Sequence, residues 1–293
     1  MSKFFVTGAS GYIGSAVTRK LVERGDQIVA LSRSDRSDDV LRTIGAVPLR
    51  GSVADFDALR RGCDGVDGAI YMAQWAPEEQ EALATIAQAL GGRAPLLFTS
   101  GASMVAEETE GRFSANRFDE DATPTPPRGS AIRIKSEDIV RHAPGIRGFA
   151  IRPGLVFGDG YSGQVDLYVQ AVRQHGVVGI VGPGDNHWGV IHRDDLADLY
   201  LAALGRGTAG GLYHAVAGEV RMGDVAQAVG EALRCATEHW TIEEAADRYG
   251  KFQARVMLGS SCRPFADVTA AALGYRPMRT DLIDEITSGS IGR

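Results

Sequence analysis

Three glycines near the N-terminus have the spacing of a phosphate-binding turn. Gly8, Gly11 and Gly14 follow an apolar run at 4–6 and precede a helical pattern whose apolar residues recur every three or four positions. In such a turn the glycines permit a tight bend, bring main-chain amides to phosphate oxygens and let the helix lie close to the strand. The positive end of the helix dipole then faces the phosphates. This order predicts a dinucleotide-binding site with contacts from Gly8, Ser10, Gly11, Tyr12, Ile13 and Gly14.

The end of the second predicted strand carries residues that distinguish one dinucleotide from another. Enzymes specific for NAD have an acidic residue here, which binds the 2'-hydroxyl of the adenosine ribose. This chain has Ser32, Arg33 and Ser34 instead. A guanidinium can pair with a 2'-phosphate, and serine hydroxyls can donate hydrogen bonds to it. We therefore predict NADP(H) as the cofactor, against the alternative that Arg33 is a solvated side chain before an exposed run at 35–39.

The elements that must position these residues are short apolar runs that alternate with amphipathic helical stretches. This order is typical of a parallel sheet covered by helices on both faces. We predict an α/β protein with a doubly wound, Rossmann-type parallel sheet. Its strands are expected at Phe4 to Thr7, Gln27 to Leu31, Ala46 to Leu49, Gly68 to Met72, Pro95 to Thr99, Gly148 to Arg152 and Gly189 to His192. The long polar stretch 104–129 is predicted to be a loop across the top of the sheet, and loops of this length are usually functional.

Composition and charge argue against several classes of protein. The chain has 293 residues, of which 44% are apolar and 23% charged, and a net charge of −6, as in an ordinary globular protein. No long basic run offers a surface for nucleic acid or an anionic membrane. The three cysteines lack metal-binding or disulfide spacing, and no run of 18 apolar residues occurs. We expect a cytoplasmic monomer or homodimer that holds no metal and binds a small-molecule substrate.

Five segments resemble the short-chain dehydrogenase/reductase superfamily, in its extended, epimerase/dehydratase-like branch. They are the glycine turn, Gly51 to Asp55, Phe98 to Gly101, Ile151 to Gly158 and Val190 to Ala197. The resemblance implies a dinucleotide-binding domain at 1–158 and 188–218, and a smaller, mostly helical substrate lobe at 159–187 and 219–293. It also implies further cofactor contacts from Ser52, Val53, Met72, Ala73, Gln74, Thr99, Lys135, Pro153, Gly154 and Val156.

The catalytic residues of this superfamily are only partly present. Its members carry a Tyr-x-x-x-Lys pair on one helix, where the lysine lowers the tyrosine pKa and the phenol donates a proton to the nascent alkoxide. Here Lys135 matches the lysine, but Ala131 stands where the tyrosine is expected, and Gly101 replaces the usual serine. The chain therefore resembles an atypical subgroup that shares the segment Arg133 to Glu137.

Four side chains are candidates for the missing acid: Lys135, Ser103, Tyr161 and His192. A positioned general acid contributes about 10²- to 10⁴-fold to the rate, so its loss would raise the barrier to ketone reduction by roughly 3 to 5.5 kcal/mol. Each candidate also has a purely structural alternative, such as solvation, packing or a hydrogen bond to the main chain. The substrate is predicted to lie among Trp75, Ser100, Ser103, Tyr161 and His192.

These features together indicate an NADP(H)-dependent oxidoreductase. We interpret it as a reductase of a C=O, C=N or activated C=C bond in a small or medium organic metabolite. One alternative is an epimerase, isomerase or lyase that the cofactor assists without net turnover. The other is a nucleotide-binding sensor that has lost catalysis together with its tyrosine.

Overall fold

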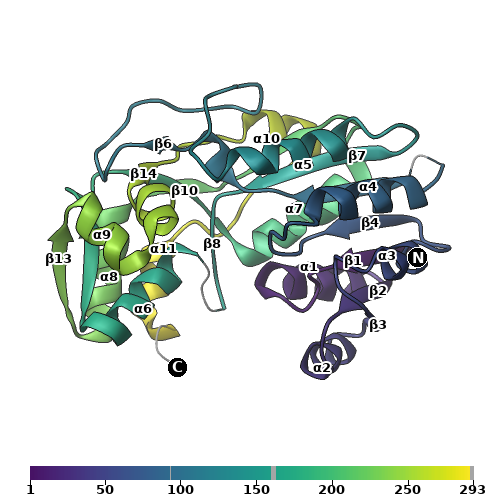
Figure 1. Ribbon diagram of the computed structural model, residues 1–293, viewed down its shortest axis with the longest axis horizontal. Helices are drawn as coiled ribbons and strands as arrows, with labels where there is room; N and C mark the ends of the chain where they lie inside the picture. The colour runs from purple at the N-terminus through teal and green to yellow at the C-terminus, as the bar shows by residue number, and fades with distance from the viewer. Residues whose placement is uncertain (93, 160–162, 291–293) are drawn as a thin grey trace.

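A seven-stranded parallel sheet forms the larger part of the computed structural model, which describes residues 1–92, 94–159 and 163–290 (Figure 1). Its strands lie in the order β11-β7-β5-β4-β1-β2-β3, and every neighbouring pair is parallel. The strand bounds are β1 Lys3–Thr7, β2 Gln27–Ser32, β3 Val47–Arg50, β4 Gly68–Tyr71, β5 Pro95–Thr99, β7 Arg147–Pro153 and β11 Leu212–Ala215. The predicted doubly wound sheet is confirmed.

Helices cover both faces of this sheet, because its strands are apolar on both sides. Phe4 and Val6 of β1 point to one face and pack in a core with α1 (Tyr12–Glu23) and α7 (Arg193–Arg206). Phe5 points to the other face and packs with α3 (Phe56–Gly62), α4 (Glu79–Ala89) and α5 (Ala131–Arg141). This alternation is the two-residue period of a strand.

The order of the strands reverses direction at β1. From β1 the chain proceeds outward to β2 and β3, and it then returns to β4 on the opposite side. Ligands of doubly wound sheets bind at the carboxyl ends of the strands beside such a switch point. The loops that follow β1 and β4 are therefore the expected walls of the cofactor site.

A smaller lobe lies beside the large sheet (Figure 1). It holds a three-stranded sheet of β8 (Leu155–Phe157), β10 (His187–His192) and β12 (Gly218–Arg221), and a pair formed by β9 (Val177–Val181) and β13 (Ala236–Trp240). Its helices are α6 Gln164–His175, α8 Met222–Leu233, α9 Ile242–Tyr249, the π-helix η2 Gln253–Leu258, α11 Leu282–Glu285 and the π-helix η3 Ile286–Ser290. Trp188, Val229 and Trp240 belong to a separate hydrophobic core in this lobe.

Two strand assignments differ from the sequence prediction. The run Gly189 to His192 was expected in the main sheet, but it belongs to β10 and pairs with β8 and β12. The seventh strand of the main sheet is β11, which pairs with β7. Its four residues, Leu212–Ala215, are too few to give a clear period, and His214 interrupts the apolar run although it is fully buried.

The predicted loop at 104–129 is irregular apart from the end of η1 (Ala102–Val105) and the short strand β6 (Glu107–Glu108). β6 pairs with β14 (Ser260–Ser261), and Phe118 forms a bridge to Pro264 beside α10 (Asp267–Leu273). The loop thus connects the region above the main sheet to the C-terminal part of the chain.

No helix in the described part of the chain is both long and apolar enough to cross a membrane. The same residues include no group of three or more His, Cys, Asp or Glu side chains placed to hold a metal ion. Cys63 and Cys262 are buried thiols, and Cys235 is half-buried.

Candidate cofactor and active site

Two positions of the glycine turn, Gly8 and Gly14, have no room for a side chain. Gly8 has φ +74°, and a Cβ on it would lie 2.4 Å from the carbonyl oxygen of Met72. A Cβ on Gly14 would lie 2.0 Å from the carbonyl oxygen of Gly8, so α1 packs against the end of β1. Both distances are far shorter than van der Waals contact. The tight turn and the close helix are therefore as the sequence predicts.

Gly11 presents the open side of this turn. It is the N-cap of α1, it has φ −79° and ψ 178°, and no side chain caps the helix. The first turn of α1 contains no acidic residue. Main-chain amides that no side chain caps, at a positive helix end without a competing carboxylate, are what a diphosphate requires. The residues present fit a dinucleotide.

Tyr12, the first residue of α1, joins the two lobes. Its hydroxyl donates to the carbonyl oxygen of Gly158 at 2.7 Å, and the guanidinium of Arg193 lies 5.2 Å from its ring centre. Burial raises the pKa of this phenol well above its usual value. Tyr12 therefore stays protonated, and its proton is already donated within the protein.

The serines expected at the 2'-phosphate are engaged elsewhere. Ser32 is buried and donates to the carbonyl oxygen of Ser34 at 3.2 Å. Ser34 is the N-cap of α2 (Asp35–Thr43), where its hydroxyl accepts a hydrogen bond from the amide of Ser37 at 3.2 Å. These hydroxyls shape the loop, so the recognition of a phosphate is left to other side chains.

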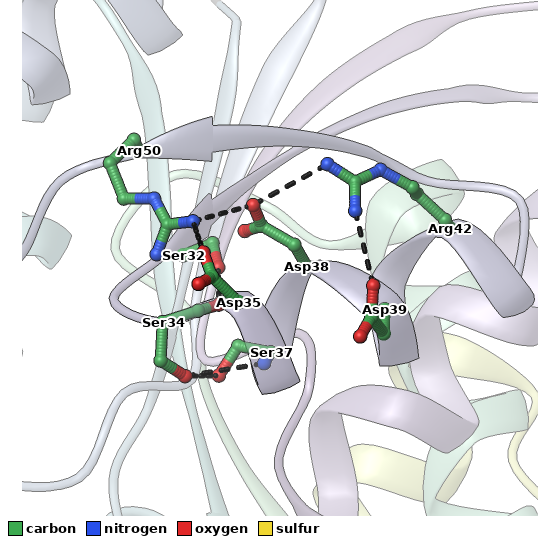
Figure 2. Close-up of polar contacts among 8 residues, drawn as sticks. All are labelled: Ser32, Ser34, Asp35, Ser37, Asp38, Asp39, Arg42 and Arg50. Carbon is green, nitrogen blue, oxygen red and sulfur yellow. Dashed lines mark hydrogen bonds and ion pairs between the residues drawn. The ribbon is translucent and has the colours of Figure 1, made fainter.

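Acidic residues at the start of α2 are neutralised by two arginines (Figure 2). Arg50 pairs with Asp35 at 2.6 Å and with Asp38 at 2.7 Å, and Arg42 contacts Asp38 and Asp39. Asp38 is buried, which corrects the view of 35–39 as a wholly exposed run. This network holds α2 against β3.

Two arginines beside this network have no ion pair or hydrogen-bond partner in the described part of the chain. Arg33 is exposed, and none of the hydrogen bonds and ion pairs between described residues involves it or Arg36. Arg36 lines an open cavity of about 660 Å³ between α1 and α2, together with Ser10 and Arg19. Free cations are thus available beside the glycine turn, at the end where the adenosine is expected.

The remaining cofactor candidates lie at the carboxyl ends of the strands. Met72, Ala73 and Gln74 follow β4, and the amide of Met72 donates to the carbonyl oxygen of Thr7 at 3.1 Å. Ser52 and Val53 follow β3, where the Ser52 hydroxyl accepts from the amide of Ala54 at 3.3 Å. The side chain of Thr99 is occupied by a hydrogen bond of 2.7 Å with the Tyr200 hydroxyl. Pro153, Gly154 and Val156 lie at the junction of β7 and β8.

A second cavity, of about 670 Å³, lies beyond the ends of β4 and β5. Its polar lining residues are Ser100, Ser103, Ser130 and Arg133. Its large apolar lining residues are Trp75, Met104, Ile132, Phe252 and Met257. Trp75, Ser100 and Ser103 of the predicted substrate site are therefore brought together, and we call this space the substrate cavity.

Two serine hydroxyls of the substrate cavity form a hydrogen bond with each other. Ser130 is buried and its hydroxyl donates to the Ser103 oxygen at 3.4 Å. The proton of Ser103 is then free to point into the cavity. The Ser100 oxygen is buried and has no hydrogen-bond partner among the described residues.

Helix α5 turns Arg133, and not Lys135, toward the substrate cavity. Arg133 lines it, whereas Lys135 is exposed and does not. Successive residues of a helix are about 100° apart, so two positions place these side chains on nearly opposite faces. Ala131 is exposed as well. This part of the cavity wall is made by Gly129, Ser130, Ile132 and Arg133 instead.

Arg133 is tied to a buried carboxylate. It pairs with Glu79 at 3.2 Å, donates to the carbonyl oxygen of Thr99, and stacks 4.9 Å from the centre of the Phe98 ring. Glu79 is 1% exposed and also accepts from Ser136 at 2.7 Å. Burial raises the pKa of Glu79, and Arg133 opposes that rise. The positive charge of Arg133 at the cavity wall is therefore neutralised by Glu79, which lies on the buried side.

A second buried ion pair fixes α5 on the sheet. Arg152 of β7 binds both carboxylate oxygens of Glu137, at 2.8 and 2.6 Å. This bidentate geometry is the most specific that an arginine and a carboxylate can make. It sets the rotation of α5 and hence the direction of Arg133.

His192, another candidate for the missing acid, is not among the described residues that line the substrate cavity. His192 is the N-cap of α7, and its Nδ1 accepts a hydrogen bond from the amide of Asp194 at 3.1 Å. The N-cap is therefore His192 and not Asp194. Burial lowers the pKa of this imidazole. Tyr161 lies outside the described residues.

Comparison with known proteins decides the family. The profile of the NAD dependent epimerase/dehydratase family matches residues 4–216. The chain belongs to this family. Membership in the NAD-dependent epimerase/dehydratase family confirms the resemblance to the epimerase/dehydratase-like branch.

Proteins similar to this epimerase/dehydratase-family chain include an uncharacterised protein, a reductase and a dehydratase. An uncharacterised protein of Schizosaccharomyces pombe is 29% identical, over 98% of each chain. The 2-alkyl-3-oxoalkanoate reductase of Stenotrophomonas maltophilia is 27% identical, over 69% of this chain and 65% of its own. A similar solved structure is that of DesIV, a dTDP-glucose 4,6-dehydratase from Streptomyces venezuelae, with NAD bound. It superimposes on 98% of this chain and 95% of DesIV with a TM-score of 0.77, at 18% sequence identity. The likeness to DesIV is one of fold.

Proposed function

We propose that this protein is an NADP(H)-dependent reductase of a C=O, C=N or activated C=C bond. The observation that carries the proposal is the substrate cavity, which lies beyond β4 and β5, one strand from the glycine turn after β1. A dinucleotide held at that turn and extended along the strand ends would bring its nicotinamide to this cavity. When bound, the reduced nicotinamide supplies a hydride to the substrate carbon and is left oxidised.

The protein's own residues would hold the cofactor at three places. The main-chain amides at the start of α1 would bind the diphosphate, while the Gly11 amide donates to the Gly8 carbonyl oxygen at 3.0 Å and closes the turn. Arg33 and Arg36 bind the 2'-phosphate, since their guanidinium groups are unpaired in this structure. Met72, Ala73 and Gln74 line the ribose region after β4, where the backbone approaches Gly8.

Ser103 takes the part of the hydrogen-bond donor to the substrate. Its oxygen accepts from Ser130, so its proton is available to an oxygen or nitrogen atom that gains charge as hydride arrives. A neutral hydroxyl is a weak acid, and we therefore assign it stabilisation of the developing charge, with the final proton coming from solvent. Lys135 is not assigned as a proton donor to the substrate, because it does not line the substrate cavity.

Two relatives of named activity support a reductase over an epimerase or lyase. The Stenotrophomonas maltophilia relative is a reductase of 2-alkyl-3-oxoalkanoates, and a second relative, from Stigmatella aurantiaca, is named as a ketoreductase. Both align over about 70% of this chain, at 69% and 71%. The alternative of a nucleotide-binding sensor is distinguished from a reductase by experiment.

The proposal is tested by following NADPH absorbance at 340 nm with a panel of ketones, enones and cyclic imines. We expect consumption of NADPH with at least one class and a kcat about 10-fold lower for Ser103→Ala, since one hydrogen bond to a developing charge is lost. Binding of NADPH without consumption of any substrate in the panel would support the sensor and contradict the reductase.

Arg33→Ala is expected to weaken NADPH binding about 10- to 150-fold and to leave NADH nearly unchanged. The reason is the loss of charge-assisted hydrogen bonds to a phosphate that NADH lacks, worth roughly 1.5 to 3 kcal/mol. Arg42→Ala is the matched control, because Arg42 has the same charge but is paired with Asp38 and Asp39. Calorimetric Kd values that rise equally for both nucleotides would remove Arg33 from the 2'-phosphate site.

A further inference from the structure

Three large apolar side chains that line the substrate cavity are exposed to solvent. Trp75 is 51% exposed, Ile132 42% and Phe252 41%, and all three line this one cavity. They come from three separate elements: the loop after β4, the first turn of α5, and the segment before η2. Large apolar side chains that converge at one exposed place mark a surface that a ligand covers.

The charge at this cavity is already compensated. Arg133 is the one charged side chain among the described residues that line it, and Glu79 pairs with it from the buried side. A diphosphate-linked substrate would bring two further negative charges without a free cation to meet them. Transfer of charged groups to such a site is strongly unfavourable unless they are paired. The cavity therefore disfavours nucleotide-linked or carboxylate substrates.

The remaining polar groups suit a single small acceptor. Ser103 offers one hydrogen bond, and the buried Ser100 oxygen offers an unpartnered hydroxyl at the same wall. A cavity of about 670 Å³ with few polar groups has the size and character of sites for small organic ligands. The opposite wall, Phe252 and Met257, comes from the π-helical region of the smaller lobe, and π-helical turns are frequent at functional sites.

We propose that the substrate is an uncharged, largely apolar carbonyl compound. Its hydrocarbon part lies against Trp75, Ile132 and Phe252, and its carbonyl oxygen lies beside Ser103. This inference rests on the proposed reductase, but it concerns binding and can be tested without turnover.

The test measures calorimetric Kd values of 2-alkanones of four to ten carbons for the protein saturated with NADP⁺, which cannot reduce them. Burial of each methylene is expected to tighten binding two- to fourfold. The keto acid 9-oxodecanoate and UDP-glucose should bind at least 10-fold more weakly than 2-decanone. Trp75 should report the binding by fluorescence, because Trp188 and Trp240 are buried, and Trp75→Phe should remove that signal.

Variants locate the apolar part of the ligand. Phe252→Ala is expected to weaken 2-decanone binding about 10-fold, while Phe113→Ala, which removes a ring that is more exposed (54% against 41%) and does not line the cavity, should change nothing. Ile132→Glu places a charge in the same wall at an exposed helical position, and it should weaken 2-decanone even if Phe252→Ala folds poorly.

Three results would overturn the inference: an affinity independent of chain length, tighter binding of UDP-glucose or 9-oxodecanoate than of 2-decanone, or equal effects of the two phenylalanine variants. Failure of the proposed reductase looks different. It would appear as normal binding of 2-alkanones with no oxidation of NADPH by any of them.

Discussion

Arg133→Ala is expected to lower the free energy of unfolding by about 3 to 5 kcal/mol. The variant leaves Glu79, a carboxylate with 1% exposure, without its cation, and an uncompensated buried charge of this kind costs about that much. In a chain of this size the midpoint of thermal unfolding should fall by roughly 10 °C. Urea unfolding followed by circular dichroism measures the change.

The pH dependence of the same variant identifies the cause. Burial already raises the pKa of Glu79, and removal of Arg133 raises it further. A carboxyl whose pKa is higher in the folded state than in the unfolded state binds more protons when folded, so stability is lost as the pH rises through that interval. Arg133→Ala should therefore be closest to wild type near pH 4.5 and furthest from it near pH 8.

Two further variants are the controls for Arg133. Lys135→Ala removes the same charge from the exposed face of α5 and should change stability by no more than about 0.5 kcal/mol. Glu79→Gln in the Arg133→Ala background removes the stranded charge but can keep the hydrogen bond to Ser136, and it should restore most of the loss. If Lys135→Ala were as damaging as Arg133→Ala, the compensating ion pair would not be the cause.

The cofactor turn could be predicted from the sequence because its requirements are local. Gly8, Gly11 and Gly14 lie within one strand, one turn and one helix, and the positive φ of Gly8 and the close approach of Gly14 to the Gly8 oxygen are both set within this segment. The serines beside Arg33 could not be assigned in the same way. Ser34 serves equally well as a helix N-cap or as a phosphate ligand, and only the fold shows that it caps α2.

The rotation of α5 was not available from the sequence. Alignment on the family's lysine favoured Lys135, whereas the buried pair Glu137–Arg152 turns Arg133 inward. The sequence does single out the segment Arg133 to Glu137 as a motif. Its structural role depends on Arg152 in β7, which pairs with Glu137. Side chains that meet across long separations in the chain leave no local pattern.

The apolar wall of the substrate cavity was missed for the same reason. Phe252 and Met257 lie more than 100 residues beyond Ser103 in the chain, in a segment whose π-helical backbone has no established sequence signal. The predicted proton donors are confirmed only in part. Ser103 does line the cavity, while His192 follows a strand as predicted but uses its Nδ1 to cap α7.

Gly11→Asp is expected to abolish dinucleotide binding without harm to the fold. Gly11 is an N-cap with φ −79°, which any residue can adopt, and a Cβ there would lie 3.2 Å from the Gly8 oxygen, a contact that a small shift relieves. Aspartate is a preferred N-cap, so its carboxylate should accept hydrogen bonds from the amides of Ile13 or Gly14 and stabilise the helix slightly. The same carboxylate excludes a diphosphate by occupancy and by repulsion.

Calorimetric titration of NADPH into wild-type protein and Gly11→Asp therefore tests the central claim, that the amides at the start of α1 grip the cofactor. We predict clear heat of binding for wild type, a Kd at least 100-fold higher for Gly11→Asp, and a thermal midpoint for the variant at or slightly above that of wild type. Equal binding by a correctly folded Gly11→Asp, or no heat from wild type with either NADPH or NADH, would contradict the account.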